Sequence, residues 1–107
     1  MPAHKIYATQ EEQLAAAQRR RNDAFLQKRY GISADQFDAI LAAQGGHCVF
    51  CSRRKETNGN RLSVDHDKKT GRIRGILCLL HNGALGAFGD TREGLQRALV
   101  YLEVPDA

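Results

Sequence analysis

The 107-residue sequence predicts a small α+β domain at residues 30–107, in which a short β-hairpin is flanked by helices, preceded by a basic helical arm at residues 1–29. Three observations support this prediction. Residues 11–29 are good helix formers without Gly or Pro, and two short alternating segments enclose a turn at residues 69–71. Paired Cys-x-x-Cys and Cys-x-x-His motifs offer four metal ligands, which would stabilise a core of this size.

The first two helices have recognisable ends. A helix is expected from Glu11 to about Arg29, with a thin apolar stripe, and the Tyr30-Gly31 pair should end it. Ser33 and Gln36 have the spacing of a capping box, which predicts the start of a second helix. Ile32 and Phe37 could form the accompanying hydrophobic staple, and the glycines at 45–46 should end this second helix.

The second half of the chain predicts the hairpin and two more helices. Residues 62–64 and 72–74 are expected as strands, and residues 57–60 as a separate turn. A helix is expected from Cys78 onward. Asp90 is expected to cap a last helix, with Glu93 at its third position and Pro105 beyond its end. Three leucines should share one face of that helix: Leu95, Leu99 and Leu102.

Composition and charge narrow the class of protein. The longest apolar run, residues 75–80, is too short for a membrane span, and the N-terminus carries no signal-peptide pattern. A cytoplasmic protein with reduced cysteines is therefore expected. The net charge is +4, and it is concentrated at residues 19–29 and 53–74, which carry +4 and +5. Two basic blocks favour a polyanionic partner, although a solvated basic surface would give the same pattern.

The cysteines predict a structural zinc site. Cys48 and Cys51 form one pair, and Cys78 and His81 follow as a second pair, which together supply four ligands for tetrahedral Zn²⁺. A redox motif would require a strand before the first cysteine, whereas glycines precede it here. Two alternatives stay open: the three cysteines could be buried apolar residues, and His47 could replace one ligand.

A second cluster lies between the two zinc pairs. Asp65, His66 and Asp67 are consecutive, and Asn82 directly follows the last predicted zinc ligand. Carboxylate and amide oxygens suit Mg²⁺ or Mn²⁺, and a histidine beside such an ion can take a proton from water. Each of these residues could instead be an ordinary turn or helix-cap residue. A zinc site that ties the hairpin to the helix after Cys78 would allow Asp65 and Asn82 to share one ion.

Residues 30–103 resemble the recombination endonuclease VII family, a branch of the HNH, or ββα-metal, nucleases. The resemblance rests on three collinear segments: YGISADQFDAILAAQGGHCVFC, LSVDHDKKTGRIRGILCLLHNGALGAFGD and LQRALVYLE. It implies structural zinc at Cys48, Cys51 and Cys78, with His81 at a position where the family usually has a fourth cysteine. It further implies a catalytic Mg²⁺ or Mn²⁺ ion on Asp65 and Asn82, with His66 as the general base.

The sequence departs from the family pattern at Lys68, because members often read DHDH there and have a second histidine. A reduced or altered activity would follow from this replacement. The resemblance implies hydrolysis of DNA phosphodiesters, with branched DNA such as Holliday junctions as the substrate. Cleavage of ordinary duplex by an HNH nicking, restriction or packaging enzyme, and a zinc-stabilised DNA-binding module without catalysis, are the alternatives.

The remaining expectations concern the partners. The hairpin cations should position the DNA backbone without reading bases: Arg61, Lys68, Lys69, Arg72 and Arg74. The family prototype acts as a dimer, and the helix at residues 11–29 could be a dimerisation arm. The same helix could instead pack on its own domain or bind DNA.

Overall fold

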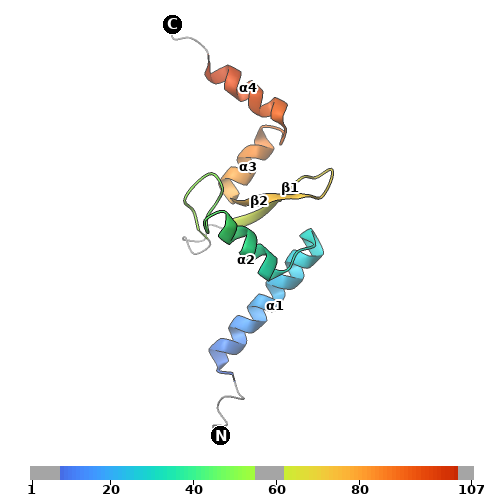
Figure 1. The fold of residues 1–107 in the computed structure, drawn as a ribbon, viewed down its shortest axis with the longest axis vertical. Coiled ribbons are helices and arrows are strands. Elements are labelled where there is room, and N and C mark those ends of the chain that lie inside the picture. The colour runs from blue at the N-terminus through green and yellow to red at the C-terminus, as the bar shows by residue number, and fades with distance from the viewer. Residues whose placement is uncertain (1–7, 55–61, 104–107) are drawn as a thin grey trace. The chain divides into compact units, whose positions relative to one another are not determined.

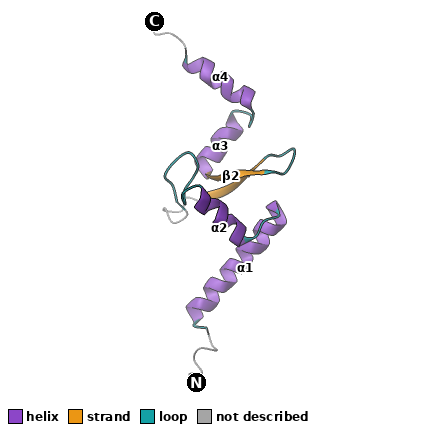
Figure 2. Cartoon of the chain, in the orientation of Figure 1, coloured by secondary structure: helices purple, strands orange, loops and turns teal. Residues whose placement is uncertain are grey.

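The computed structural model describes residues 8–54 and 62–103. Helices and strands follow one another in the order shown in Figures 1 and 2. The described elements are α1 (Gln10–Tyr30), α2 (Ala34–Ala43), β1 (Leu62–His66), β2 (Ile73–Cys78), α3 (Leu79–Ala87) and α4 (Arg92–Leu102). The small α+β class is therefore confirmed. The chain divides into two compact units, Met1–Ile40 and Leu41–Ala107.

Helix α1 in the first unit begins one residue before the predicted Glu11 and ends at Tyr30, where the Tyr30-Gly31 pair predicts its end. Thr9 is its N-cap, and the Thr9 hydroxyl oxygen accepts a hydrogen bond from the Glu12 N–H at 3.0 Å. Gly31 ends the helix in the left-handed conformation, with φ of 73°, and its N–H donates to the Gln27 carbonyl. None of the residues in α1 is buried, as its thin apolar stripe predicts.

Polar contacts connect α1 to the start of α2. The Arg19 guanidinium pairs with the carboxylates of Asp35 and Asp38, and the pKa of Arg19 is raised by these hydrogen bonds, that to Asp35 first. The Asp23 carboxylate accepts from the Ala34 N–H at 2.8 Å. Part of the charge in the first basic block is therefore neutralised within this unit.

The capping box at the start of α2 is confirmed. The Ser33 hydroxyl oxygen accepts from the Gln36 N–H at 3.0 Å, and the Gln36 side-chain oxygen accepts from the Ser33 N–H at 2.7 Å. Ile32 and Phe37 are both buried, as the staple requires. The glycines at 45–46 follow the helix with φ values of 89° and 81°, so the predicted end is also confirmed.

The second unit is built on the antiparallel pair of β1 and β2. Leu62 pairs with Cys78 at one end of the hairpin, and His66 pairs with Ile73 at the other. Strand β2 continues to Cys78, beyond the predicted residue 74, because its last four residues are all buried. The core beside the sheet consists of Cys48, Leu77 and Cys78, with Cys51, Leu62 and Leu85 packed against it.

Gln44 attaches the centre of β2 to the loop that follows α2. The Gln44 amide nitrogen donates to the Ile76 carbonyl at 2.6 Å, and the Gln44 amide oxygen accepts from the Ile76 N–H at 3.1 Å. The same nitrogen donates to the His47 carbonyl at 2.8 Å. One side chain thus replaces a neighbouring strand for the fully buried Ile76.

Helix α3 begins directly after Cys78, as predicted, whereas the predicted cap of α4 is wrong. Thr91 caps α4, and its hydroxyl oxygen accepts from the Gly94 N–H at 3.1 Å. Asp90 has a left-handed backbone with φ of 55°, which is incompatible with the extended conformation of an N-cap. Leu95, Leu99 and Leu102 in α4 are 39%, 56% and 75% exposed.

The residues around the predicted turn at 57–60, together with Pro105, lie outside the described part of the chain. Among the described helices, none is both long enough and apolar enough to cross a membrane.

Candidate functional site

Three cysteines and one histidine converge at one end of the hairpin. The potential ligand atoms of Cys48, Cys51, Cys78 and His81 all lie within 4.8 Å of one another. His81 presents Nδ1, which lies 3.2 Å from the Cys78 sulfur and 3.7 Å from the Cys48 sulfur. The Cys51 and Cys78 sulfurs are 3.8 Å apart. Zinc–sulfur bonds of about 2.3 Å in a tetrahedron place sulfurs about 3.8 Å apart, so the group could hold a metal such as zinc.

Backbone N–H groups shape both halves of this Cys₃His group. The Phe50 N–H donates to the Cys48 sulfur at 3.4 Å, and the His81 N–H donates to the Cys78 sulfur at the same distance. Each Cys-x-x-ligand turn therefore directs N–H groups at a sulfur, which stabilises the thiolate form that binds metal. Cys48 and Cys78 are almost fully buried, so the group also belongs to the core.

The three thiols differ in their electrostatic surroundings. The pKa of Cys51 is lowered to about 6, first by a hydrogen bond from the Arg53 backbone and then by the Arg53 guanidinium, which lies 3.4 Å from the sulfur. Burial raises the pKa of Cys78. The alternative ligand His47 is directed elsewhere, because its Nδ1 donates to the Cys48 carbonyl at 2.7 Å.

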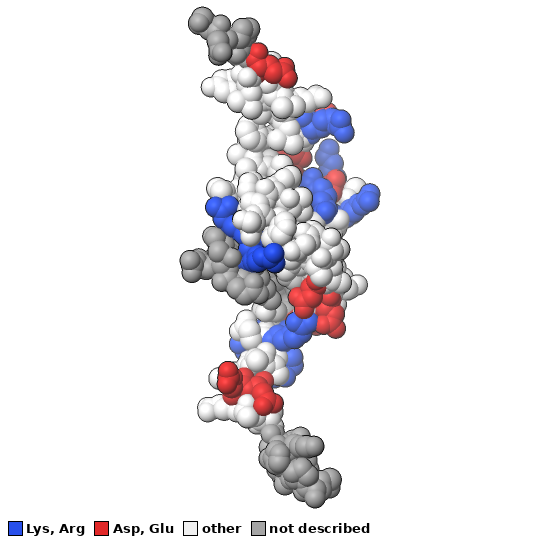
Figure 3. Space-filling view, turned by 60° about the vertical axis from the view of Figure 1, so that its left-hand side comes forward, with Lys and Arg blue, Asp and Glu red and all other residues white. Residues whose placement is uncertain are grey.

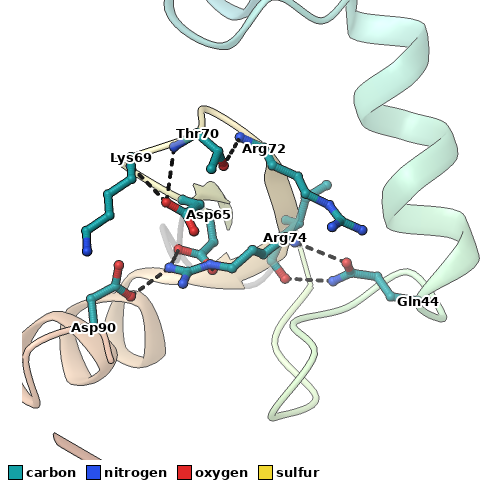
Figure 4. A network of polar contacts seen from close by, with 9 residues as sticks. Gln44, Asp65, Lys69, Thr70, Arg72, Arg74 and Asp90 are labelled. Atoms are coloured by element: carbon teal, nitrogen blue, oxygen red, sulfur yellow. Dashed lines mark hydrogen bonds and ion pairs between the residues drawn. The ribbon is translucent and has the colours of Figure 1, made fainter. Parts of the chain in front are cut away.

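The other end of the hairpin carries Asp65 and His66. Asp65 is only 8% exposed, and both of its carboxylate oxygens accept hydrogen bonds from Arg74, at 2.9 and 3.0 Å. Arg74 also donates to the Asp90 carboxylate at 2.6 Å. Figure 4 shows the Arg74 side chain extending between the two acidic residues. The pKa of Arg74 is raised by these hydrogen bonds, that to Asp65 first.

His66 and Asn82 occupy neighbouring elements. His66 is the last residue of β1 and is half-buried, and Asn82 is a half-buried residue of α3. Helix α3 packs against both strands, so the helix with Asn82 lies beside the strand that carries Asp65 and His66. A shared ion on Asp65 and Asn82, and the role of His66 as a base, stay predictions.

The turn between the strands displays the predicted cations. Lys68, Lys69 and Arg72 are exposed, and Figure 3 shows Lys and Arg side chains gathered over this part of the hairpin. Asp67 organises the turn, because its carboxylate accepts from the N–H groups of Lys69 and Thr70 at 2.8 and 3.3 Å. These hydrogen bonds, that from Lys69 first, lower the pKa of Asp67. Arg61 lies outside the described residues.

A shallow cavity of about 270 Å³ lies beside Asp65. Its charged lining residues are Asp65, Arg74, Asp90 and Arg92, and Val49, Phe50, Leu85 and Leu95 are among its apolar lining residues. Asp90 is a partner of Arg74 that the sequence motifs do not predict. An acidic residue between Gly89 and Thr91 is the only sign of this ion pair in the sequence. The spacing of Asp90 from Glu93 favours a helix cap instead.

Comparison with known proteins identifies a family for this sequence. The family described as recombination endonuclease VII matches residues 23–104. The chain is 51% identical over 81 residues to a Gene 59 protein of Mycobacterium phage D29, and 47% identical over 81 residues to a Gene 59 protein of Mycobacterium phage L5. Each alignment covers 73% of this chain, and the chain spans 47% and 48% of these two relatives. No solved structure gives a significant match.

The match covers the Cys₃His group, the hairpin and both helices that follow it. It also includes Asp65, His66 and Asn82. The chain belongs to the recombination endonuclease VII family.

Proposed function

We propose that this protein is a metal-dependent DNA endonuclease that hydrolyses phosphodiester bonds, with branched DNA such as a Holliday junction as its preferred substrate. One observation carries the proposal. The family match spans the hairpin that is anchored by the Cys₃His group at one end and carries Asp65 and His66 at the other. The proposal assigns the Cys₃His group to structural zinc and the hairpin to the HNH, or ββα-metal, arrangement.

The donor set at Asp65 suits a hard divalent cation. The Asp65 carboxylate is nearly buried and lines the cavity, and the half-buried Asn82 can add an amide oxygen from α3. Mg²⁺ or Mn²⁺ held by these residues would stabilise the negative charge that develops on the phosphate and on the leaving oxygen. Asp65 and Asn82 would hold this ion beside the reacting phosphate.

His66 supplies the proton transfer in this proposal. Its imidazole accepts a proton from the attacking water, which gains the nucleophilicity needed for in-line attack on phosphorus. Lys68, Lys69 and Arg72 are exposed on the adjacent turn and can bind flanking phosphates. If the protein neutralises about six phosphates, the logarithm of its DNA affinity falls with the logarithm of salt concentration at a slope near −5.

The experiment compares cleavage of a labelled four-way junction with that of a linear duplex of the same sequence, in Mg²⁺ or Mn²⁺. Wild-type protein is expected to cut the junction, and His66→Ala is expected to lose about 100-fold or more in rate. His47→Ala is the matched control, because His47 lies outside the Cys₃His group and bonds only locally. Equal cutting of both substrates would contradict junction preference and leave the duplex nuclease.

Absence of cutting by folded, zinc-loaded protein would contradict the nuclease and favour the DNA-binding module. Lys68→His then tests whether the departure from the family motif causes the loss. Lys68 supports this second function, because the family resemblance implies a histidine at this position in many members.

Paired cutting of a junction requires two active sites related by two-fold symmetry. We therefore propose a homodimer, for which α1 is the candidate arm, since it exposes Leu14 and Phe25 by 66% and 57%. Sedimentation of the free protein at micromolar concentration tests this arrangement. A monomer would contradict paired cutting by the free protein.

A further inference from the structure

Arg74 occupies an irregular position in the hairpin. Asp65 pairs with Gly75, and the next residue of β1, His66, pairs with Ile73, so Arg74 is the extra residue of a β-bulge. In a regular antiparallel pair, Arg74 would stand opposite His66 and point to the face away from Asp65. A bulge changes the direction of a side chain, and here the guanidinium reaches the Asp65 carboxylate.

The contact with Asp65 is a two-point ion pair. Arg74 Nε lies 2.9 Å from one carboxylate oxygen, and Nη2 lies 3.0 Å from the other. Paired, charge-assisted hydrogen bonds of this kind fix both partners in orientation. The Arg74 guanidinium therefore holds both oxygens of the carboxylate that the proposed function assigns to the catalytic cation.

Asp90 provides a second acceptor for the same guanidinium, and the turn between α3 and α4 holds it in place. The Asp90 N–H donates to the Leu85 carbonyl at 2.8 Å, and its φ of 55° is uncommon for a residue other than glycine. At Gly94, a Cβ would lie 1.6 Å from the Phe88 carbonyl oxygen, so only glycine permits this close turn. The geometry of this turn places the Asp90 carboxylate oxygen 2.6 Å from Arg74 Nη2.

The charges around Arg74 determine how the Asp65 carboxylate can respond to a divalent cation. The two carboxylates and the Arg74 guanidinium together carry one net negative charge, and Arg92 adds a positive charge to the lining of the cavity. A divalent cation at Asp65 competes with Arg74 for the same oxygens, because a carboxylate oxygen held by a donor is less available to a metal. Asp90 can keep its ion pair with the Arg74 guanidinium when that guanidinium leaves Asp65. The positive charge of Arg74 is then not left unpaired in a partly buried position.

We propose that Arg74 is a positioning residue that exchanges between Asp65 and Asp90, so that binding of the divalent cation transfers its guanidinium to Asp90. This inference rests on the proposed single-metal nuclease. Arg74 orients Asp65 before the cation binds, and afterwards presents a positive charge at the edge of the cavity, held there by Asp90. Neither residue needs to contact the cation.

The test measures Mn²⁺ affinity of the zinc-loaded protein by calorimetry, without DNA. Arg74→Gln is expected to raise the affinity about tenfold, because the competing charge-assisted hydrogen bonds are removed. Asp90→Asn is expected to lower the affinity several-fold, because Arg74 then depends on Asp65 alone. In the double variant, which combines Arg74→Gln with Asp90→Asn, the second change is expected to leave the Mn²⁺ affinity of Arg74→Gln unaltered.

The double variant separates exchange from simple charge effects. If Asp90→Asn weakens Mn²⁺ binding equally with and without Arg74, Asp90 acts directly on the cation, and the exchange is wrong. Arg72→Gln removes an exposed cation two residues away and is expected to change the affinity much less than Arg74→Gln. An equal rise in both variants would also overturn the inference.

Two further variants separate a failure of this inference from a failure of the proposed metal site. Arg74→Lys retains the charge but loses the two-point geometry, so a smaller rise in affinity is expected even if Arg74→Gln fails to fold. Asp65→Asn identifies the site, since Mn²⁺ binding that it does not remove would overturn both this inference and the proposed single-metal mechanism. Binding that Asp65→Asn removes, together with unchanged affinity in the Arg74 variants, would overturn the inference alone.

Discussion

The two ends of the β1–β2 hairpin make an instructive contrast. At the Leu62–Cys78 end, sulfur and imidazole ligands are gathered within a few ångströms, and Cys48 and Cys78 are almost fully buried. At the His66–Ile73 end, a nearly buried carboxylate is paired with a partly exposed arginine beside exposed cations. The first end is suited to hold the fold together, and the second leaves charged groups accessible to a ligand.

The difference follows from how each end is assembled. The Cys₃His group comes from two short local turns, and its N–H···S bonds are made within three residues of each sulfur. The Asp65–Arg74–Asp90 group comes from two strands and a turn between helices, and it depends on a bulge. Local turns thus preform both halves of the first group, which packing then brings together, whereas every contact of the second group depends on tertiary packing.

The largest effect is expected from removing the metal-binding end. Chelation of the proposed zinc, or Cys78→Ser, should unfold the second unit, because a structural zinc ion contributes about 10–16 kcal/mol, which exceeds the stability of most small domains. Circular dichroism and zinc stoichiometry measure this loss. Ser52→Ala is the control, since this exposed neighbour of Cys51 is not a ligand. A chelated protein that keeps its native circular dichroism spectrum would contradict the role of the Cys₃His end in holding the fold together.

The next largest effect is expected at the centre of the hairpin. Gln44→Ala removes both hydrogen bonds to the buried backbone of Ile76, and it should lower the free energy of unfolding by about 2–4 kcal/mol. Urea denaturation of the zinc-loaded protein measures the change. Gln18→Ala removes two exposed side-chain hydrogen bonds within α1 and should cost only a few tenths of a kcal/mol. Equal costs would mean that Gln44 does not support the sheet.

A smaller effect is expected from the turn that directs Asp90. Gly94→Ala places a methyl group against the Phe88 carbonyl, so the turn must shift, at a cost of about 1–3 kcal/mol. The variant should keep its zinc and lose part of its Mn²⁺ affinity, which calorimetry can measure. Gly83→Ala is the control, because a Cβ at Gly83 meets nothing within 4 Å. Equal behaviour of the two variants would contradict the close turn.

The smallest effect concerns the turn between the strands. The pKa of Asp67 is lowered in the folded protein, so its contribution to stability is present at neutral pH. That contribution declines as the pH falls from about 5 towards the lowered pKa. The difference in melting temperature between wild type and Asp67→Ala should therefore shrink over this range. A difference that grows on acidification would contradict the assigned role of Asp67 in the turn.

The sequence by itself determined the parts that depend on local chemistry. The ends of α1 and α2 follow from Thr9, Gly31 and the Ser33–Gln36 capping box, which act within one helical turn. The four ligands of the Cys₃His group follow from their spacing, because a Cys-x-x-ligand turn places both donors on one side. The hairpin follows from alternating residues around a polar turn.

Only the tertiary structure decided the surroundings of Asp65. Asp90 satisfied the sequence pattern of a helix cap, yet its left-handed backbone and its contact with Arg74 leave that role to Thr91. The bulge at Arg74 has no local sequence signal, since it arises from fitting β2 to β1 over the core. Local hydrogen bonds depend on neighbouring residues, whereas the pairing of distant charges depends on where packing brings their backbones.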